Sequence, residues 1–313
     1  SSDLSEPSNG MTSHKQATTM GAINDRTRLL RLPNVLDVEQ LCEENTMIAY
    51  REIFVDQIYG PSVADLADGD VVLDVGANIG LFTLYLNTLG KKLTVHCFEP
   101  IPQTFKALQA NMGRHDRLTA TLHNAGAANR DGVAEFTFYP KTSTSSSMYP
   151  DETPEAHGES NAYITSEIHR LSWGLTRILP AWLMSAWAES VRRDFQRAVL
   201  VPCRLVRISD VIRSAGLTRV DLLKVDVEGA EFDCIEGIDT EHWPLVQRTI
   251  VEVHGGAADR ERMERMLIDR GLTINRTFQQ SPDIFSRHYL IEASREGAAG
   301  APGIQASTKE ALT

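Results

Sequence analysis

The sequence predicts an α/β fold built on a mostly parallel sheet. Short apolar runs alternate with amphipathic helical patterns along the chain of 313 residues, and this alternation is typical of βαβ units. The second observation is a glycine turn, Gly76 to Gly80, which comes directly after one of these apolar runs. In parallel sheets, ligands commonly bind at such a turn between a buried strand and a helix.

The first half of the chain predicts three buried strands, two helices and one half-exposed strand. The apolar runs are short and uninterrupted, as buried strands require. A proline near the start of the second helix suits a first helical turn. We expect strands at Val71 to Val75, Leu93 to Phe98 and Leu118 to His123, helices at Ile79 to Leu89 and Pro102 to Met112, and the half-exposed strand at Val133 to Tyr139.

The second half continues the same alternation. We expect Ser209 to cap a helix and Gly271 to end another, since serine and glycine are typical of these two positions. The expected strands and helices are Val201 to Val206, a helix after Ser209, Val220 to Val225, a helix from about Ala230, Thr249 to Val253, a helix at Asp259 to Arg270, and closing strands at Leu272 to Phe278 and Tyr289 to Ala293.

Both ends and one internal segment depart from this alternation. Residues 1–22 and 296–313 are rich in small and polar residues, which predicts a disordered tail and a flexible linker around one domain at 23–295. Residues 141–200 become helical and tryptophan-rich, which predicts an insertion over the sheet. It either packs on the core or forms a lid over an acyl or polyketide-like substrate. For the lid, the expected substrate-binding residues are Ser147, Met148, Tyr149, Trp182 and Trp187.

Composition and charge argue against several classes of partner. The net charge of −11 disfavours sequence-independent binding to nucleic acid, which needs an excess of Lys and Arg. No apolar run approaches the roughly 20 residues that span a bilayer. The four cysteines are far apart and form no CxxC pair, so they predict neither a disulfide framework nor a zinc site. We therefore expect a reduced, cytoplasmic protein.

The glycine turn carries the features of a nucleotide-type cofactor site. Asp74 ends the strand before the turn, and Glu99 ends the next strand, 99 − 76 = 23 residues after Gly76. An acidic residue at this distance usually binds a ribose diol, which suits either NAD or S-adenosylmethionine. However, the turn lacks the second glycine of the dinucleotide motif. Asp74 would also repel a pyrophosphate, whereas it suits the ammonium of a methionine group.

Five segments together resemble the FkbM family of methyltransferases. They are DVGANIGLFT (Asp74 to Thr83), FEP (Phe98 to Pro100), LLKVDVEGAE (Leu222 to Glu231), VEVH (Val251 to His254) and the upstream REIFVDQIYG (Arg51 to Gly60). The resemblance implies the Rossmann-like class I methyltransferase fold, with a seven-stranded sheet whose last strand is antiparallel. It also implies methyl transfer, usually to a hydroxyl, in natural-product, glycan or lipid-related pathways.

The resemblance also implies a set of cofactor-binding residues. The methionine end of S-adenosylmethionine would lie at the glycine turn, the ribose at the end of the next strand, and the adenine at the end of the third. We expect Pro100 and Asp226 to contact the cofactor as well. The full set is Asp74, Gly76, Asn78, Gly80, Glu99, Pro100, Asn124, Ala125 and Asp226.

Charged residues at two strand ends predict the catalytic site. Lys224, Asp226 and Glu228 follow one apolar strand, while Glu252 and His254 lie two apart, and so on one face, at the end of the next. A hydroxyl acceptor needs a base or a metal, and His254 is the natural base. Glu228 or Glu252 would orient it, and Lys224 would neutralise a carboxylate or lower the pKa of an oxygen.

Two other roles remain open at this point for the same residues. Asp226 and Glu252 offer the hard oxygen ligands that Mg²⁺ prefers, with His254 close by. Alternatively, His254 contacts the substrate or only hydrogen-bonds the sheet.

The sequence therefore predicts an O-methyltransferase that uses S-adenosylmethionine to modify a specialised metabolite. The acceptor is either a free small molecule or bound to an acyl carrier protein, in which case neighbouring synthase domains are partners. The alternatives are an N- or C-methyltransferase, a nicotinamide-dependent oxidoreductase and a non-catalytic, methyltransferase-like binding module.

Overall fold

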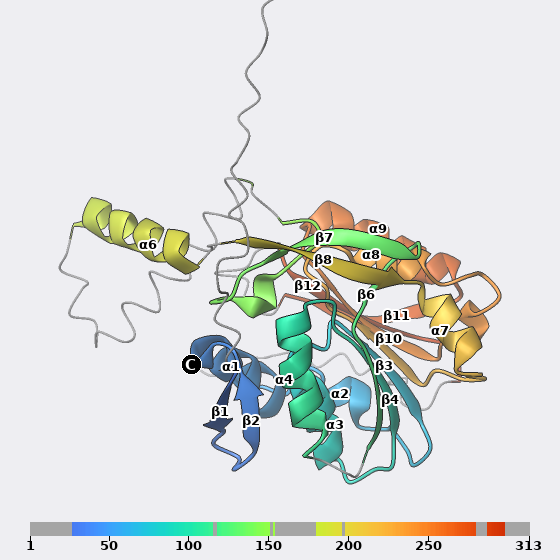
Figure 1. Ribbon diagram of the computed structural model, residues 1–313. Coiled ribbons are helices and arrows are strands. Elements are labelled where there is room, and N and C mark those ends of the chain that lie inside the picture. The colour runs from blue at the N-terminus through green and yellow to red at the C-terminus, as the bar shows by residue number, and fades with distance from the viewer. Residues whose placement is uncertain are drawn as a thin grey trace, which may run out of the picture.

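The computed structural model describes residues 27–114, 118–150, 153, 180–195, 198–279 and 287–297. Its largest element is a seven-stranded sheet with helices on both faces (Figure 1). The strand order is β11-β12-β10-β9-β3-β4-β5. The strands span Val71–Val75 (β3), Thr94–Phe98 (β4), Thr119–His123 (β5), Leu222–Val225 (β9), Arg248–Val253 (β10), Thr273–Phe278 (β11) and Tyr289–Ser294 (β12).

The directions of these strands agree with the predicted fold. β10, β9, β3, β4 and β5 run parallel to one another, whereas β12 is antiparallel to both of its neighbours. From β3 the chain adds β4 and β5 on one side, and only later adds β9 on the other side. At such a reversal of strand order, the loops after the two central strands diverge and leave a crevice. The predicted class I methyltransferase fold is confirmed.

Alternating side chains of the central strands build two cores. Val72 of β3 packs with the helices on one face of the sheet, and its neighbours Leu73 and Val75 pack with those on the other, because successive strand residues point to opposite faces. All three are fully buried. The covering helices are α3 (Leu81–Thr88) and α4 (Pro102–Met112) on the first face, and α7 (Ile208–Ser214), α8 (Glu231–Glu236) and α9 (Ala257–Asp269) on the second.

A second, three-stranded sheet flanks the insertion. β7 (Gly132–Phe138) and β8 (Val199–Val206) pair antiparallel, and β6 (Gly126–Ala127) pairs with β8. Phe138 at the end of β7 is the register partner of Val199 at the start of β8. The chain therefore leaves this sheet after Phe138 and returns to it at Val199, so the two ends of the intervening segment lie side by side. The described part of the insertion contains a 3-10 turn, η2 (Ser143–Ser145), and the helix α6 (Ala181–Phe195).

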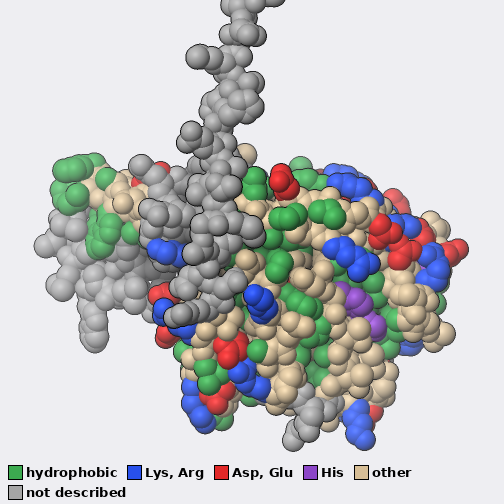
Figure 2. Space-filling view, viewed as in Figure 1, with side chains coloured by type: hydrophobic (Ala, Val, Ile, Leu, Met, Phe, Trp, Pro, Cys, Tyr) green, Lys and Arg blue, Asp and Glu red, His purple; other side chains and the backbone are tan. Residues whose placement is uncertain are grey.

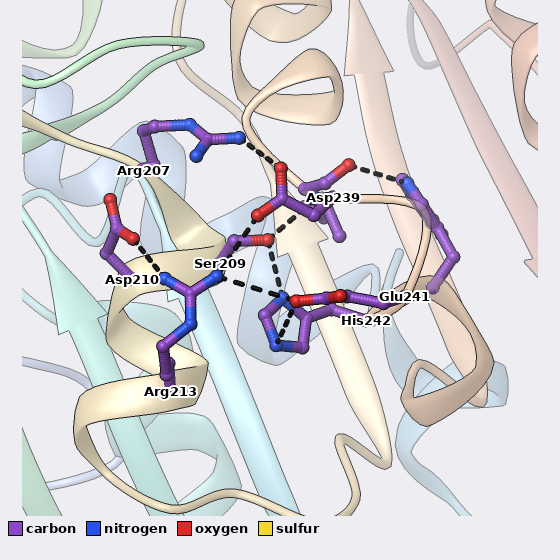
Figure 3. A network of polar contacts seen from close by, with 9 residues as sticks. Arg207, Ser209, Asp210, Arg213, Asp239, Glu241 and His242 are labelled. Carbon is purple, nitrogen blue, oxygen red and sulfur yellow. Dashed lines mark hydrogen bonds and ion pairs between the residues drawn. The ribbon is translucent and has the colours of Figure 1, made fainter.

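The expected helix cap at Ser209 is wrong. Arg207 is the N-cap of α7, and its side chain makes no capping bond. Ser209 lies inside the helix, fully buried, where its Oγ accepts a hydrogen bond from the Asp239 amide at 2.6 Å and lies 2.7 Å from His242 Nδ1. Figure 3 shows this network, in which Asp239 also binds Arg207. The serine ties α7 to the loop after α8.

The N-terminal described segment packs beside the first two helices of the sheet. It contains a hairpin of β1 (Arg28–Arg31) and β2 (Asp37–Gln40), followed by α1 (Glu43–Tyr50), a π-helical turn η1 (Arg51–Val55) and α2 (Gly60–Val63). Asn111 of α4 binds the backbone of Glu39 in both directions, at 2.6 and 2.9 Å. Among the described helices, none has the length and hydropathy needed to cross a membrane.

Candidate active site

The turn after β3 forms a tight cradle against the loop after β9. Gly76 has φ +79°, and a Cβ atom at this position would lie 1.7 Å from the carbonyl oxygen of Asp226. Glycine is therefore required both by the backbone angle and by the close approach. Asn78 also has a positive φ of 50°, and its Oδ1 accepts a hydrogen bond from the Ile79 amide at 2.7 Å.

Below this turn, a buried ion pair joins β3 to β9. Asp74 is fully buried; its Oδ2 accepts a hydrogen bond from Thr83 at 2.8 Å, and its Oδ1 lies 3.3 Å from Lys224 Nζ. Lys224 also donates to the carbonyl of Gly76 at 3.0 Å and lies 3.5 Å from Asp226. Burial lowers the pKa of Lys224, but Asp74 and Asp226 outweigh it, so the pKa is raised overall. Lys224 is thus a fixed cation that holds the cradle.

The end of β4 brings the expected ribose and adenine residues together. Glu99 is 6% exposed, and its Oε1 accepts a hydrogen bond from the Ile101 amide at 2.8 Å. Burial raises its pKa to about 7, although the amides of Ile101 and Asn78 act against this shift. Asn124 donates to the carbonyls of Glu99 and Pro100 at 2.9 and 3.1 Å, and Ala125 beside it is buried.

At the ends of β9 and β10, His254 lies among three carboxylates. Its Nδ1 is 2.7 Å from Glu231 Oε1, and the same oxygen accepts a hydrogen bond from the Gly229 amide at 2.8 Å. Its Nε2 lies 3.5 Å from Glu228 and 3.7 Å from Glu252. Glu231, and not Glu228 or Glu252 as expected, is therefore the carboxylate that contacts Nδ1, while Glu228 and Glu252 lie on the side of the second ring nitrogen.

The pKa values of this group are strongly displaced. Burial lowers the pKa of His254, but Glu228 and Glu231 outweigh it, and the pKa lies well above its ordinary value. Burial raises the pKa of Glu228 to about 7, and burial together with the charge of Asp226 raises that of Glu252. Clusters of groups with strongly displaced pKa values are typical of catalytic sites.

The same residues offer two sets of metal ligands. Asp226, Glu228 and His254 form one set, and Glu252, His254 and His288 form the other, with the ligand atoms of each set within 4.8 Å of one another. The expected pair of Asp226 and Glu252 is thus divided between two sets that share His254. The first set has two oxygen donors and suits a harder ion than the second, which has two imidazoles.

The expected substrate-binding residues fall into two groups. Ser147 is buried, and its Oγ donates to the carbonyl of Glu228; Tyr149 donates to Asp233 at 2.7 Å, and Met148 lies between them in the chain. This group therefore lies against the loop after β9. Trp182 and Trp187 are 71% and 45% exposed, on a helix that lies to one side of the main sheet (Figures 1 and 2). Within the described residues, the two tryptophans are not brought to the strand ends.

Several residues of the site were not among the sequence-based candidates. Glu231 appeared only as the last residue of the LLKVDVEGAE segment, while Glu52, Tyr59 and His288 were not singled out. Glu52 and Tyr59 lie in the REIFVDQIYG segment, so its resemblance to the family was an available signal. His288 directly precedes β12, and nothing in its local sequence predicts a site.

Comparison with known proteins decides the family. The family model described as "Methyltransferase FkbM domain" matches residues 74–279. The chain belongs to the FkbM family of methyltransferases. Members of this family use S-adenosylmethionine as the methyl donor, and the Gly76 cradle and the Glu99 carboxylate fit a cofactor of this kind. The predicted family and cofactor are confirmed.

The curated relatives come from bacteria and fungi. The chain is 32% identical to 31-O-demethyl-FK506 methyltransferase FkbM of Streptomyces tacrolimicus, over 80% of this chain and 91% of the relative. It is also 32% identical to methyltransferase sdnD of Sordaria araneosa, over 79% and 89%. A third match, 35% identical over 71% of this chain, covers 10% of AMB antimetabolite synthetase AmbE of Pseudomonas aeruginosa.

Among solved structures, the chain resembles magnesium protoporphyrin IX methyltransferase from Synechocystis PCC 6803 with bound S-adenosylmethionine. The TM-score is 0.41 at 10% identity, over 81% of this chain and 83% of the other.

Proposed function

We propose that this FkbM-family enzyme methylates a hydroxyl group of a specialised metabolite, with His254 as the general base. The observation that carries the proposal is the Glu231–His254 pair, whose 2.7 Å contact holds Nδ1 and leaves Nε2 to receive a proton. This arrangement of a base oriented by a carboxylate is the one that activates hydroxyl nucleophiles in other enzymes. Asp226 connects the two parts of the site, because its carbonyl lies against Gly76 and its carboxylate lies within 4.8 Å of a His254 ring nitrogen.

The chemistry requires one proton acceptor. Bound S-adenosylmethionine supplies an electrophilic methyl group, and its transfer to a hydroxyl oxygen releases one proton. Nε2 of neutral His254 takes that proton, and Glu231 stabilises the resulting imidazolium. Because the pKa of His254 is raised, its neutral form appears only as pH rises above the ordinary histidine range. We therefore expect kcat/KM to increase with pH beyond neutrality.

A metal-assisted version of the same reaction is the second candidate. The set of Asp226, Glu228 and His254 supports it, because two carboxylates and one imidazole suit a divalent ion. Such an ion would lower the pKa of the acceptor hydroxyl. His254 would then be a ligand and not the base.

Two features support the proposed acceptor class. Two of the relatives carry names that specify oxygen, 31-O-demethyl-FK506 methyltransferase and 2-O-methyltransferase NoeI of Sinorhizobium fredii. The match within a synthetase supports an acceptor held on a carrier protein, with synthase domains as neighbours. In that case, Ser147, Met148 and Tyr149, which lie against the loop after β9, are the candidate contacts of the tethered chain. Most of the predicted lid, at 154–179, lies outside the described residues.

The direct test is methylation of candidate hydroxylated metabolites, presented free and on a carrier protein, followed by intact mass spectrometry. The proposal expects a gain of one methylene mass on oxygen, with S-adenosylhomocysteine formed in equal amount. Fragment spectra that place the methyl group on nitrogen or carbon would overturn O-methylation. Calorimetry in which the protein binds NAD and not S-adenosylmethionine would overturn the cofactor assignment.

A further inference from the structure

The short segment 147–149, which we call the strap, lies against the loop that follows β9. Ser147 is tied to Thr137 of β7 by two backbone hydrogen bonds, at 2.8 and 3.1 Å. Two residues later, the Tyr149 hydroxyl donates to Asp233 of α8 at 2.7 Å. The Tyr149 carbonyl oxygen would lie only 3.3 Å from a Cβ atom added at Gly229. The strap therefore connects the three-stranded sheet to the loop after β9.

The Ser147 hydroxyl makes two hydrogen bonds inside the protein. Ser147 is 2% exposed; its Oγ donates to the carbonyl of Glu228 and accepts from the Tyr149 amide at 2.9 Å. Glu228 has a φ of 56° and Gly229 a φ of +100°. A left-handed backbone is unfavourable for a glutamate, so this turn persists only where surrounding contacts hold it. Ser147 supplies one of these contacts.

A single peptide group connects Ser147 to the catalytic histidine. The carbonyl of Glu228 and the amide of Gly229 belong to one planar unit, which turns as a rigid body. Its oxygen accepts the hydrogen bond from Ser147, and its N–H donates to Glu231 Oε1 at 2.8 Å. The same oxygen of Glu231 contacts His254 Nδ1 at 2.7 Å. The strap thus fixes one end of a peptide plane whose other end holds the carboxylate that orients the base.

Loss of the Ser147 hydroxyl would leave this peptide plane free to rotate. Rotation would remove the Gly229 amide from Glu231 and turn the Glu228 carbonyl oxygen toward the same carboxylate, which it would repel. Relief of the left-handed conformation at Glu228 would favour that rotation. Because proton transfer depends on precise placement of the base, a small displacement of Glu231 and His254 would slow the reaction.

We propose that Ser147 is a positioning residue for the base: its hydroxyl holds the Glu228–Gly229 peptide in the orientation in which Glu231 orients His254. The inference rests on the proposed function, because it takes His254 as the group that receives the acceptor proton. It assigns to the strap a role in turnover that is separate from binding of the acceptor or of the cofactor.

Steady-state kinetics of Ser147→Ala with an accepted substrate test the proposal. We expect kcat to fall about tenfold, while the acceptor KM and the affinity for S-adenosylhomocysteine change by less than about threefold. Ser147→Thr and Ser147→Val have side chains of nearly the same shape and differ in the hydroxyl, so the first should turn over about tenfold faster than the second. The matched control is Ser146→Ala, which removes a neighbouring hydroxyl that accepts from the Tyr139 amide at 3.2 Å. This control should keep the wild-type kcat.

Hydrogen exchange of the Gly229 amide is a second measurement, and it requires no acceptor. In the wild-type protein this amide is protected by its hydrogen bond to Glu231. We expect it to exchange about tenfold faster in Ser147→Ala, because the peptide plane loses its contact at the carbonyl end. In Ser146→Ala the exchange rate should stay at the wild-type value.

The outcomes separate the two proposals. Full turnover in a folded His254→Ala enzyme overturns the proposed function, and this inference with it. If His254→Ala loses turnover but Ser147→Ala keeps the wild-type kcat, or keeps its Gly229 amide fully protected, the inference fails while the proposed function stands. A raised acceptor KM at unchanged kcat makes Ser147 an acceptor-binding residue, and equal kcat values in the threonine and valine variants make its role one of packing. Both results also contradict the inference.

Discussion

The two halves of the active site differ in how their charges are balanced. In the cofactor half, Asp74 and Lys224 are both almost fully buried and paired at 3.3 Å, and the backbone of the turn is fixed by the close approach of Gly76 to Asp226. In the acceptor half, three carboxylates lie within 4 Å of the His254 ring nitrogens, and Glu228 has the strained φ of 56°.

This difference separates a preformed binding site from a reactive one. A balanced, rigid half can hold the cofactor without rearrangement, whereas unbalanced buried charge destabilises the free protein and is retained where it serves chemistry. Mutations in the first half should therefore act mainly on cofactor affinity, and mutations in the second mainly on turnover and on the pH dependence of stability.

The largest expected effect on cofactor affinity is that of Gly76→Ala. The added Cβ would lie 1.7 Å from the Asp226 carbonyl oxygen, so the loops after β3 and β9 must separate, and affinity for S-adenosylhomocysteine should fall by about a hundredfold or more. Gly90→Ala is the matched control, because it has a similar φ of +70° but nothing within 4 Å of the new atom. Calorimetry of the two variants should show loss of binding in the first alone; equal affinities would mean that the cradle does not bind the cofactor.

The next effect concerns the residue that orients the base. Glu231→Gln removes the charge that holds His254 Nδ1 and should lower kcat by about tenfold or more, with unchanged affinity for S-adenosylhomocysteine. Glu236→Gln, on the same helix and with its partner Arg262 at 3.8 Å, should keep wild-type turnover. Steady-state kinetics would contradict the account if both variants behaved alike.

The sequence predicts the cofactor half more completely than the acceptor half. The bounds of β3 and α4 were predicted from local apolar runs and Pro102, and the cradle was predicted because its turn is contiguous in sequence. The acceptor half could not be predicted in full, because Glu231 and His288 approach His254 only through the packing of separate elements. Ser209 was assigned wrongly for a related reason, since its partners Asp239 and His242 lie 30 residues or more away in sequence.

A smaller effect is expected at the ribose position. Glu99→Ala should remove charge-assisted hydrogen bonds to the cofactor, each of about 1.5–3 kcal/mol, and weaken cofactor binding at least about tenfold. Glu135→Ala removes an exposed carboxylate of β7 and serves as the control. Unchanged calorimetric affinity in a folded Glu99→Ala protein would exclude this residue from the cofactor site.

The smallest effect is on stability. Because the pKa of Glu52 is raised from 4.5 to about 7, its neutral form favours folding, and this contribution is present below the unfolded pKa and lost as pH rises through the folded value. Glu52→Gln should therefore be more stable than the wild type by about 1 kcal/mol near pH 8, with little difference near pH 5. Urea unfolding at both pH values checks this; a variant that is less stable near pH 8 would show that the ionised carboxylate is stabilised by a partner.

The central claim is that His254 removes the acceptor proton, and the turnover of His254→Ala with an accepted substrate tests it most directly. A positioned base contributes about 10²–10⁴-fold to rate, so kcat should fall by that factor while S-adenosylhomocysteine affinity stays at the wild-type value. The wild-type enzyme should keep its activity after exhaustive chelation, since the base needs no metal. Full turnover in a folded His254→Ala enzyme would contradict the account, and wild-type activity that is lost on chelation and restored by Mg²⁺ would transfer the role to a metal ion.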